Sequence, residues 1–144
     1  MNLSKAAKVT RVMNAVAAGT SDQNSGSVDM KNFDAVQFVV AFGAITASAV
    51  TSVHVETSSD DSTFNDLEGT NVAVADDDDN QLVIVEVDCP QERYLRVVVD
   101  RGTQNAVIDG AIAFQHKADT EPVTHDTTTV VGSEYHLAPD EGTI

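Results

Sequence analysis

The sequence has no tryptophan, five phenylalanines and two tyrosines, so aromatic side chains can fill only a small part of a core. Its apolar residues are mostly Val and Ala. A β-branched side chain such as Val loses less freedom on a pleated surface than against a helical turn. The composition therefore predicts a thin, β-branched core and favours strands over helices.

Cysteine is almost absent as well. The single Cys89 excludes an internal disulfide, and no CxxC motif or neighbouring histidine gives it a partner. We expect Cys89 to be a small buried filler at the end of a strand. A chain of 144 residues is long enough to bury a core without disulfides or metals, so we expect about one domain.

Basic residues are scarce: 8 Lys and Arg stand against 23 Asp and Glu, which gives a formal charge of −15. Such a surface repels nucleic acid and anionic lipid, so neither is expected as a partner. Lys5, Lys8 and Arg11 precede the first acidic residue, Asp22. They form a basic arm on an acidic body, which is either a solvated terminus or a dock for an acidic partner. These three residues are our candidates for contacts with such a partner.

Long apolar runs are missing too. None approaches the roughly 18 residues of a membrane span, so no membrane partner is expected. The basic residues of the arm interrupt the first nineteen positions, unlike a secretory signal, so we expect the mature chain to start at or near Met1. Residues 1–18 can be drawn as a helix or as an arm leading into a strand at about 12–17. We favour the strand.

Five segments carry apolar residues in a strand-like pattern, and four of them alternate with a period of two. They are residues 36–45, 50–57, 82–88, 94–101 and 107–117. Clusters of Gly, Asp, Asn and Ser separate them at the spacing of a sandwich. The pattern predicts an all-β fold, an antiparallel two-sheet β-sandwich of jelly-roll type, with an extended N-terminal arm and a C-terminal tail.

The faces of these strands differ. Residues 36–45 are apolar on both faces, so this strand is expected in the middle of a sheet, with Val39 and Ala41 available for a neighbouring subunit. In 82–88 the end that carries Leu82 and Ile84 is expected to be covered. In 107–117, Ile108, Ile112 and Phe114 are expected on one side of the strand.

The chain divides into three parts: an arm or first strand (1–18), a sandwich core (19–118) and a C-terminal tail (119–144). The tail is polar and too poor in apolar residues to close a core alone. It is either disordered or an extended arm that becomes ordered by adding to another surface.

Catalytic and metal signatures are missing. The run Asp76–Asp79 lacks the alternate spacing and glycine of an EF-hand, so a solvated loop is the better interpretation. The four histidines form neither HxH nor HxxxH, and the chain contains no GxSxG elbow or Walker loop. We therefore expect no enzyme, no cofactor and no metal site.

The stretch VHVETSSDDSTFNDL, residues 53–67, predicts a strand, a turn and an aromatic anchor, with Phe64 returning to the core. Together with RYLRVVV, residues 93–99, it resembles a paired motif of galactose-binding and discoidin-like jelly-roll domains, and departs from it at Asp61, where those domains usually carry Gly. The resemblance implies a jelly-roll core and, as the alternative function, a carbohydrate-binding module on a virion surface. The lack of Trp weakens that sugar-binding role.

A second resemblance covers about residues 10–144. The order VDMKNFDAVQFVVAFGAIT, the 53–67 corner, RYLRVVVDRGTQNAVIDGAIAFQHKA, and then EPVTH with VVGSEYHLAPDEGT is similar to capsid decoration, or cement, proteins of tailed bacteriophages. It implies a structural virion protein on the capsid exterior that binds the major capsid protein of an HK97-type shell and stabilises the shell. It also implies self-association, with a homotrimer expected, and brings no catalytic residues.

Overall fold

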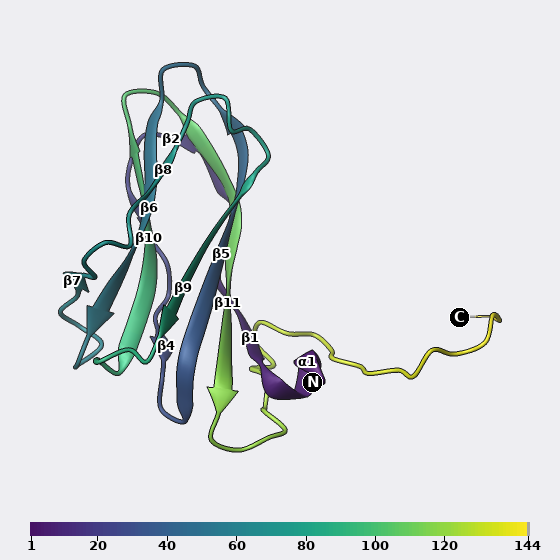
Figure 1. Ribbon diagram of the computed structural model, residues 1–144. Coiled ribbons are helices and arrows are strands. Elements are labelled where there is room, and N and C mark those ends of the chain that lie inside the picture. Colours follow the sequence, from purple (N-terminus) through teal and green to yellow (C-terminus); the bar gives the residue numbers. More distant parts are fainter. Residues whose placement is uncertain (144) are drawn as a thin grey trace.

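The computed structural model describes residues 1–143, and its two antiparallel sheets pack face to face as a β-sandwich (Figure 1). The sandwich predicted from the alternating valines is therefore confirmed. One short helix, α1 (Leu3–Ala6), precedes the strands. No helix among the described residues is long and apolar enough to cross a membrane.

The first sheet, here called sheet A, holds the two longest strands at its centre. Its order is β1 (Lys8–Met13), β11 (Ala106–Ala118), β5 (Phe33–Ile45) and β9 (Leu82–Asp88), with β2 (Val16–Gly19) also paired to β11. The other sheet, sheet B, has the order β3 (Gln23–Asn24), β10 (Tyr94–Gly102), β6 (Val50–Ser58) and β7 (Asn65–Asp66). Two further short strands join it: β4 (Val28–Asp29) pairs with β10, and β8 (Val72–Val74) pairs with β6.

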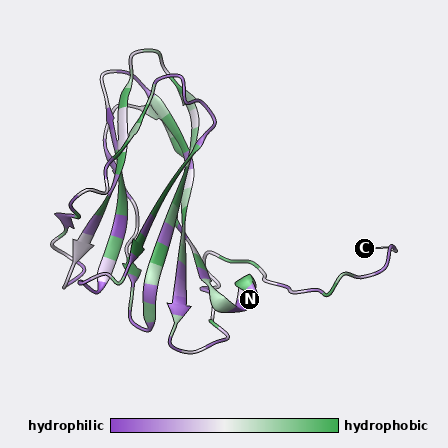
Figure 2. Cartoon of the chain, viewed as in Figure 1, coloured by the Kyte–Doolittle hydropathy of each residue, from purple (hydrophilic) through white to green (hydrophobic). Residues whose placement is uncertain are grey.

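The core lies between the sheets and is built from the alternating residues expected to face inward. Val36, Phe38 and Val40 of β5 have no exposed surface, and neither have Val53 and Val55 of β6. Leu95, Val97 and Val99 of β10 close the core from sheet B. In Figure 2 the strands are largely green, for hydrophobic residues, while the connecting loops are largely purple.

A β-bulge in β11 overturns the expected alignment of Ile108, Ile112 and Phe114. The register with β5 shifts between Ile108 and Gly110, so Ile108 points into the core while Ile112 and Phe114 lie on the outer face of sheet A. Gly110 permits this bulge because its φ is +143° and a Cβ there would lie 3.1 Å from the carbonyl oxygen of Met13. The inward positions after the bulge are the small residues Ala111 and Ala113.

The N-terminal region forms two successive strands rather than the one strand expected at 12–17. Residues 8–13 form β1 and residues 16–19 form β2, and both pair with β11. Asn14 and Ala15 interrupt them, and both are exposed. Most of the basic arm is therefore part of sheet A.

The corner after β6 is a turn, as predicted. The prediction that Phe64 returns to the core is wrong. The Asp60 carboxylate accepts hydrogen bonds from the backbone N–H groups of Ser62 (3.0 Å) and Thr63 (2.9 Å), and these bonds lower the pKa of Asp60 to about 2. Phe64 lies instead on the outside of sheet B, where the Arg96 guanidinium stacks 4.1 Å from its ring centre. Leu67 packs against the core in its place.

Cys89 is exposed rather than buried, which corrects the expectation of a core filler. It follows the last residue of β9 and has a φ of +50°, so the chain turns away from the sheet at this point. The negative charge of Asp88 raises the pKa of the Cys89 thiol.

A buried arginine joins the two sheets at one end of the sandwich. The side chain of Arg101, on β10, donates hydrogen bonds to the carbonyl oxygens of Ser21 (2.7 Å), Ala17 (2.9 Å) and Ala106 (2.7 Å). The residue is only 5% exposed, and its burial lowers the pKa of the guanidinium. One side chain of sheet B thus holds the chain around β2 and the start of β11 in sheet A.

Candidate docking surface

The outer face of sheet A carries an apolar surface that neither sheet covers. Cross-strand register places its residues in rows, since paired residues share a face. One row runs Arg11, Ile112, Val39 and Ile84 across β1, β11, β5 and β9, and the next runs Gly110, Ala41 and Leu82. We call Val39, Ala41, Leu82, Ile84 and Ile112 the apolar face.

Three members of the apolar face are conspicuously exposed. Leu82 is 60% exposed, Ile84 56% and Ile112 39%. The sequence predicted that Leu82 and Ile84 would be covered, and within this chain they are not. Contiguous exposed apolar side chains of this kind mark surfaces that bind another protein. The two-sided pattern of residues 36–45 indicated such a face, but only the bulge in β11 adds Ile112 to it.

Two polar pairs border the apolar face at the C-terminal ends of β9 and β11. His116 Nε2 lies 2.7 Å from Glu86 Oε1, and Lys117 Nζ lies 2.7 Å from Asp88 Oδ2. The hydrogen bond from Lys117 lowers the pKa of Asp88 and raises that of Lys117 itself. An apolar centre with a polar border is the usual anatomy of a protein interface.

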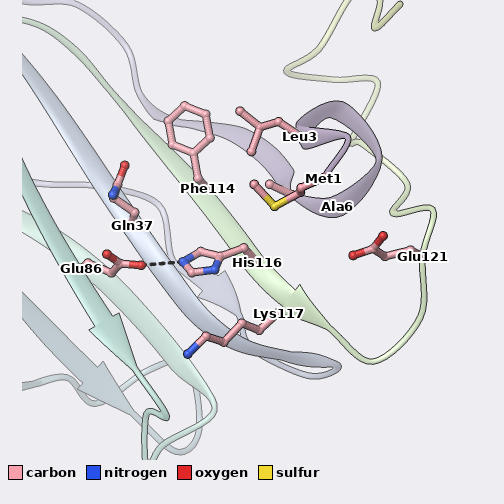
Figure 3. A pocket seen from close by; sticks show the side chains of 10 residues that line it. Met1, Leu3, Ala6, Gln37, Glu86, Phe114, His116, Lys117 and Glu121 are labelled. Atoms are coloured by element: carbon pink, nitrogen blue, oxygen red, sulfur yellow. Dashed lines mark hydrogen bonds and ion pairs between the residues drawn. The ribbon is translucent and has the colours of Figure 1, made fainter. Parts of the chain in front are cut away.

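A hollow of about 530 Å³ lies where α1 crosses this end of the sheet (Figure 3). Leu3 and Ala6 approach it from α1 and Met1 from the residues before the helix, and Phe114 and His116 approach it from β11. Leu3 is 56% exposed, so the helix leaves the hollow open on one side. Further along the same face, Val130 of the tail lines a second hollow of about 490 Å³ beside Ile112.

The N-terminal arm and the beginning of the tail are hydrogen-bonded to each other at the β1 edge of sheet A. The backbone N–H of Val123 donates to the carbonyl oxygen of Lys5 (2.8 Å). The ring of His125 accepts a hydrogen bond from the Val9 N–H at Nδ1 (3.2 Å) and donates from Nε2 to the carbonyl of Ser4 (3.1 Å). The beginning of the tail is therefore attached to the arm through Val123 and His125, which we call the clamp. No sequence motif indicated this contact.

Beyond this clamp the tail extends away from the sandwich as a strand-free segment (Figure 1). Three of its apolar side chains are exposed: Val131, Tyr135 and Leu137. The Lys5 ammonium lies 5.6 Å from the centre of the Tyr135 ring, and this contact joins the basic arm to the tail.

The three candidate contacts follow one another along this edge, and Lys8 and Arg11 point to opposite faces of sheet A. Lys5 is in α1, Lys8 and Arg11 are in β1, and Lys5 and Arg11 are exposed. None of the three forms an ion pair with a carboxylate of residues 1–143. Hydrogen bonds from Thr128 and then the charge of Lys8 lower the pKa of Asp126 in the tail, so Lys8 has one acidic group nearby. The structure thus places three basic side chains on α1 and β1, beside the start of the tail.

The outer face of sheet B is different because it is charged. His54, Glu56, Arg96 and Asp100 project from β6 and β10, and Arg96 donates a hydrogen bond to Glu56. The two sides of the sandwich are therefore suited to different partners.

The carboxylates of the Asp76–Asp79 loop mostly bond to backbone groups. Asp76 and Asp79 accept hydrogen bonds from the N–H groups of Ser48 and Ile45, and Asp78 accepts one from Ala75 (2.9 Å). Asp76 and Asp79 therefore hold this loop to the chain at Ile45 and Ser48, and Asp78 bonds within its own loop, so the three carboxylates have separate partners.

No family model matches the chain, and no curated protein matches it significantly.

Proposed function

We propose that this protein is a structural virion protein that binds the outside of a tailed-phage capsid and stabilises the shell. The observation that carries the proposal is the terminal edge, where the arm and the clamp of the tail meet and Lys5, Lys8 and Arg11 form no ion pair among residues 1–143. On a body with a formal charge of −15, this edge is the part suited to an acidic surface. The resemblance to decoration proteins supports the same role.

In this proposal the partner is the major capsid protein of an HK97-type shell, and the location is the capsid exterior. The acidic body keeps the protein soluble at the high local concentration of a crowded shell. The extended tail supplies a second point of attachment, because its exposed Tyr135 and Leu137 can add to a neighbouring surface.

We assign the apolar face to contacts between copies of the protein, with a homotrimer as the proposed assembly. Val39 and Ala41 stand at its centre, and Ile84 and Leu82 extend it to the β9 edge. Burying the three exposed side chains against a second copy stabilises the assembly by roughly 25 cal/mol for each Å² removed from water.

Co-sedimentation with undecorated expanded shells tests the capsid contact. We expect the wild-type protein to sediment with the shells and the triple variant K5Q/K8Q/R11Q to remain in the supernatant. Neutralisation is preferable to deletion of the arm, because residues 8–13 form β1 and their loss would expose β11.

A matched control removes three positive charges elsewhere, in the variant K31Q/R93Q/K117Q. Both triple variants change the formal charge from −15 to −18, so a difference between them reports the position of the charges. Equal binding by the two variants would mean that the terminal edge is not the dock. If folded wild-type protein does not sediment with the shells, the proposed capsid binding is wrong.

Light scattering tests the assembly. We expect a trimer for the wild type and a smaller species for Ile84→Glu, which places a charge in the apolar face. Val50→Glu is the control, since Val50 is 66% exposed on sheet B and the substitution adds the same charge. A 15.2 kDa species for the wild type, both free and on shells, contradicts the assembly.

The sugar-binding alternative depends on exposed aromatic side chains, and on sheet B the ring of Phe64 is stacked against the Arg96 guanidinium. A glycan array read against a scrambled control tests it independently of the shells.

A further inference from the structure

Three ligand-type side chains meet on the outer face of sheet B. His54 and Glu56 are two residues apart on β6 and therefore share a face, and Asp66 of β7 is the register partner of Glu56. His54 Nε2 lies 3.3 Å from Asp66 Oδ1 and 3.8 Å from Glu56 Oε1. One ligand atom from each residue lies within 4.8 Å of the other two.

The other ring nitrogen of His54 already has a partner. Nδ1 lies 2.9 Å from Asp100 Oδ2, and a carboxylate can only accept a hydrogen bond, so Nδ1 carries a proton. In the neutral ring this leaves the lone pair on Nε2, and Nε2 is on the side of the two carboxylates. Three electron-rich atoms facing one another require a positive charge between them.

A metal ion bound by all three ligand atoms supplies such a charge. Nε2 is shielded from water, yet it forms no hydrogen bond within residues 1–143, although Asp66 Oδ1 is only 3.3 Å away. A ring nitrogen that faces two carboxylates without a hydrogen bond is the arrangement expected of a metal ligand, because each ligand approaches a shared ion from its own direction.

The distances also suit a tetrahedral ion. Zinc binds His nitrogen and carboxylate oxygen at about 2.0–2.2 Å, so neighbouring ligand atoms of a tetrahedral site lie roughly 3.4 Å apart. The separations of 3.3 Å and 3.8 Å at Nε2 are close to this value. Three protein ligands leave a fourth position open towards a groove lined by Asp22, Glu68 and Asn71.

The groups behind the ligands match those of a metal site as well. Asp100 fixes the ring of His54 through Nδ1, and Ser52 donates a hydrogen bond to the same Asp100 carboxylate (3.2 Å). Arg96 donates to Glu56 Oε2, which leaves Glu56 Oε1 facing His54. A histidine bonded to a carboxylate through its second nitrogen is the usual support of a metal ligand.

We propose that His54, Glu56 and Asp66 bind a divalent transition metal of the zinc class, with Asp100 and Arg96 orienting the ligands. No sequence motif indicated this site, because one ligand comes from a different strand and no HxH or HxxxH spacing arises. The site is independent of the capsid proposal, since it lies on sheet B, away from the terminal edge.

Titration of the chelator-treated protein with ZnCl₂ in a calorimeter tests the proposal, with Co²⁺ as a spectroscopic probe. We expect one saturable site per chain and a visible Co²⁺ spectrum of tetrahedral type. His54→Gln is expected to abolish both signals, and Asp100→Asn to weaken zinc binding about 10–100-fold.

Two further variants control for folding and for non-specific binding to the acidic surface. Asp66 has a side chain that is 81% exposed, so Asp66→Asn leaves the fold intact and is expected to remove the tetrahedral Co²⁺ spectrum. His116→Gln removes a histidine that also faces a carboxylate but has no third ligand, and it is expected to bind zinc like the wild type. No saturable zinc binding, or equal binding by wild type, His54→Gln and Asp66→Asn, overturns the proposal.

Discussion

Arg101 allows the clearest prediction about stability, because its charged side chain is almost completely buried and bonds to carbonyl oxygens, with no ion pair to a carboxylate among residues 1–143. Replacing it by methionine, in Arg101→Met, keeps a long flexible side chain but removes every donor. The three carbonyl oxygens of Ser21, Ala17 and Ala106 then lose their hydrogen bonds from the guanidinium.

The magnitude follows from these three bonds. A hydrogen bond to a charged group contributes about 1.5–3 kcal/mol, so their sum is about 4–9 kcal/mol. Part of this is offset because methionine does not carry the cost of burying a charge. We expect Arg101→Met to lower the free energy of unfolding by about 3–5 kcal/mol. For a domain of this size that is a decrease in Tm of roughly 10 °C.

Urea denaturation followed by circular dichroism measures this change. Arg93→Met is the control, since Arg93 forms an ion pair with Asp29 but its side chain is 50% exposed. Its loss is expected to lower the free energy of unfolding far less than the loss of Arg101, because solvent screens an exposed ion pair. If Arg101→Met is as stable as Arg93→Met, the three buried bonds do not hold the sheets together and the reasoning is wrong.

Three further predictions concern local features. Gly110→Ala is expected to cost roughly 1–3 kcal/mol, because φ is +143° and the carbonyl oxygen of Met13 is close, whereas Gly132→Ala, in open space, should change little; equal urea midpoints would contradict this. Hydrogen bonds from Arg93 lower the pKa of Asp29 to about 2, so this carboxylate stabilises the fold above about pH 4 and the contribution is lost as the pH falls to about 2. Asp29→Asn should therefore lose less stability than the wild type over that interval, and parallel curves would refute the assignment. Cys89 is exposed but its pKa is raised, so it should react with iodoacetamide slowly at pH 8 and faster in Asp88→Asn; unchanged rates would show that Asp88 does not control the thiol.

The sequence predicted the body of the sandwich well, because period-two alternation encodes which side of a strand faces the core. Residues 82–88 form β9 with the predicted bounds, and Val53, Val55 and Val97 point inward as expected. Such predictions need only the local pattern and the geometry of a pleated strand.

The errors occurred where a local irregularity or a distant partner decides the outcome. A bulge at Gly110 reverses the faces of all later residues in β11, and alternation cannot reveal it in advance. Phe64 stacks on Arg96, which is far along the chain, and Cys89 leaves the sheet at a left-handed turn. The docking surface was indicated only by the two-sided β5.

The basic residues at the terminal edge were visible in the sequence, but their environment was not. Lys5, Lys8 and Arg11 precede every acidic residue, so a charge count finds them. Only the fold shows that two of them belong to β1 and that the tail is clamped beside them through Val123 and His125.

The thermal stability of undecorated expanded shells, measured by calorimetry with and without saturating protein, tests the central claim most directly. A ligand that binds only the assembled shell raises the temperature at which the shell is disrupted. The account predicts such an increase with wild-type protein and none with K5Q/K8Q/R11Q at the same concentration. An unchanged transition with folded wild-type protein present in excess would contradict it.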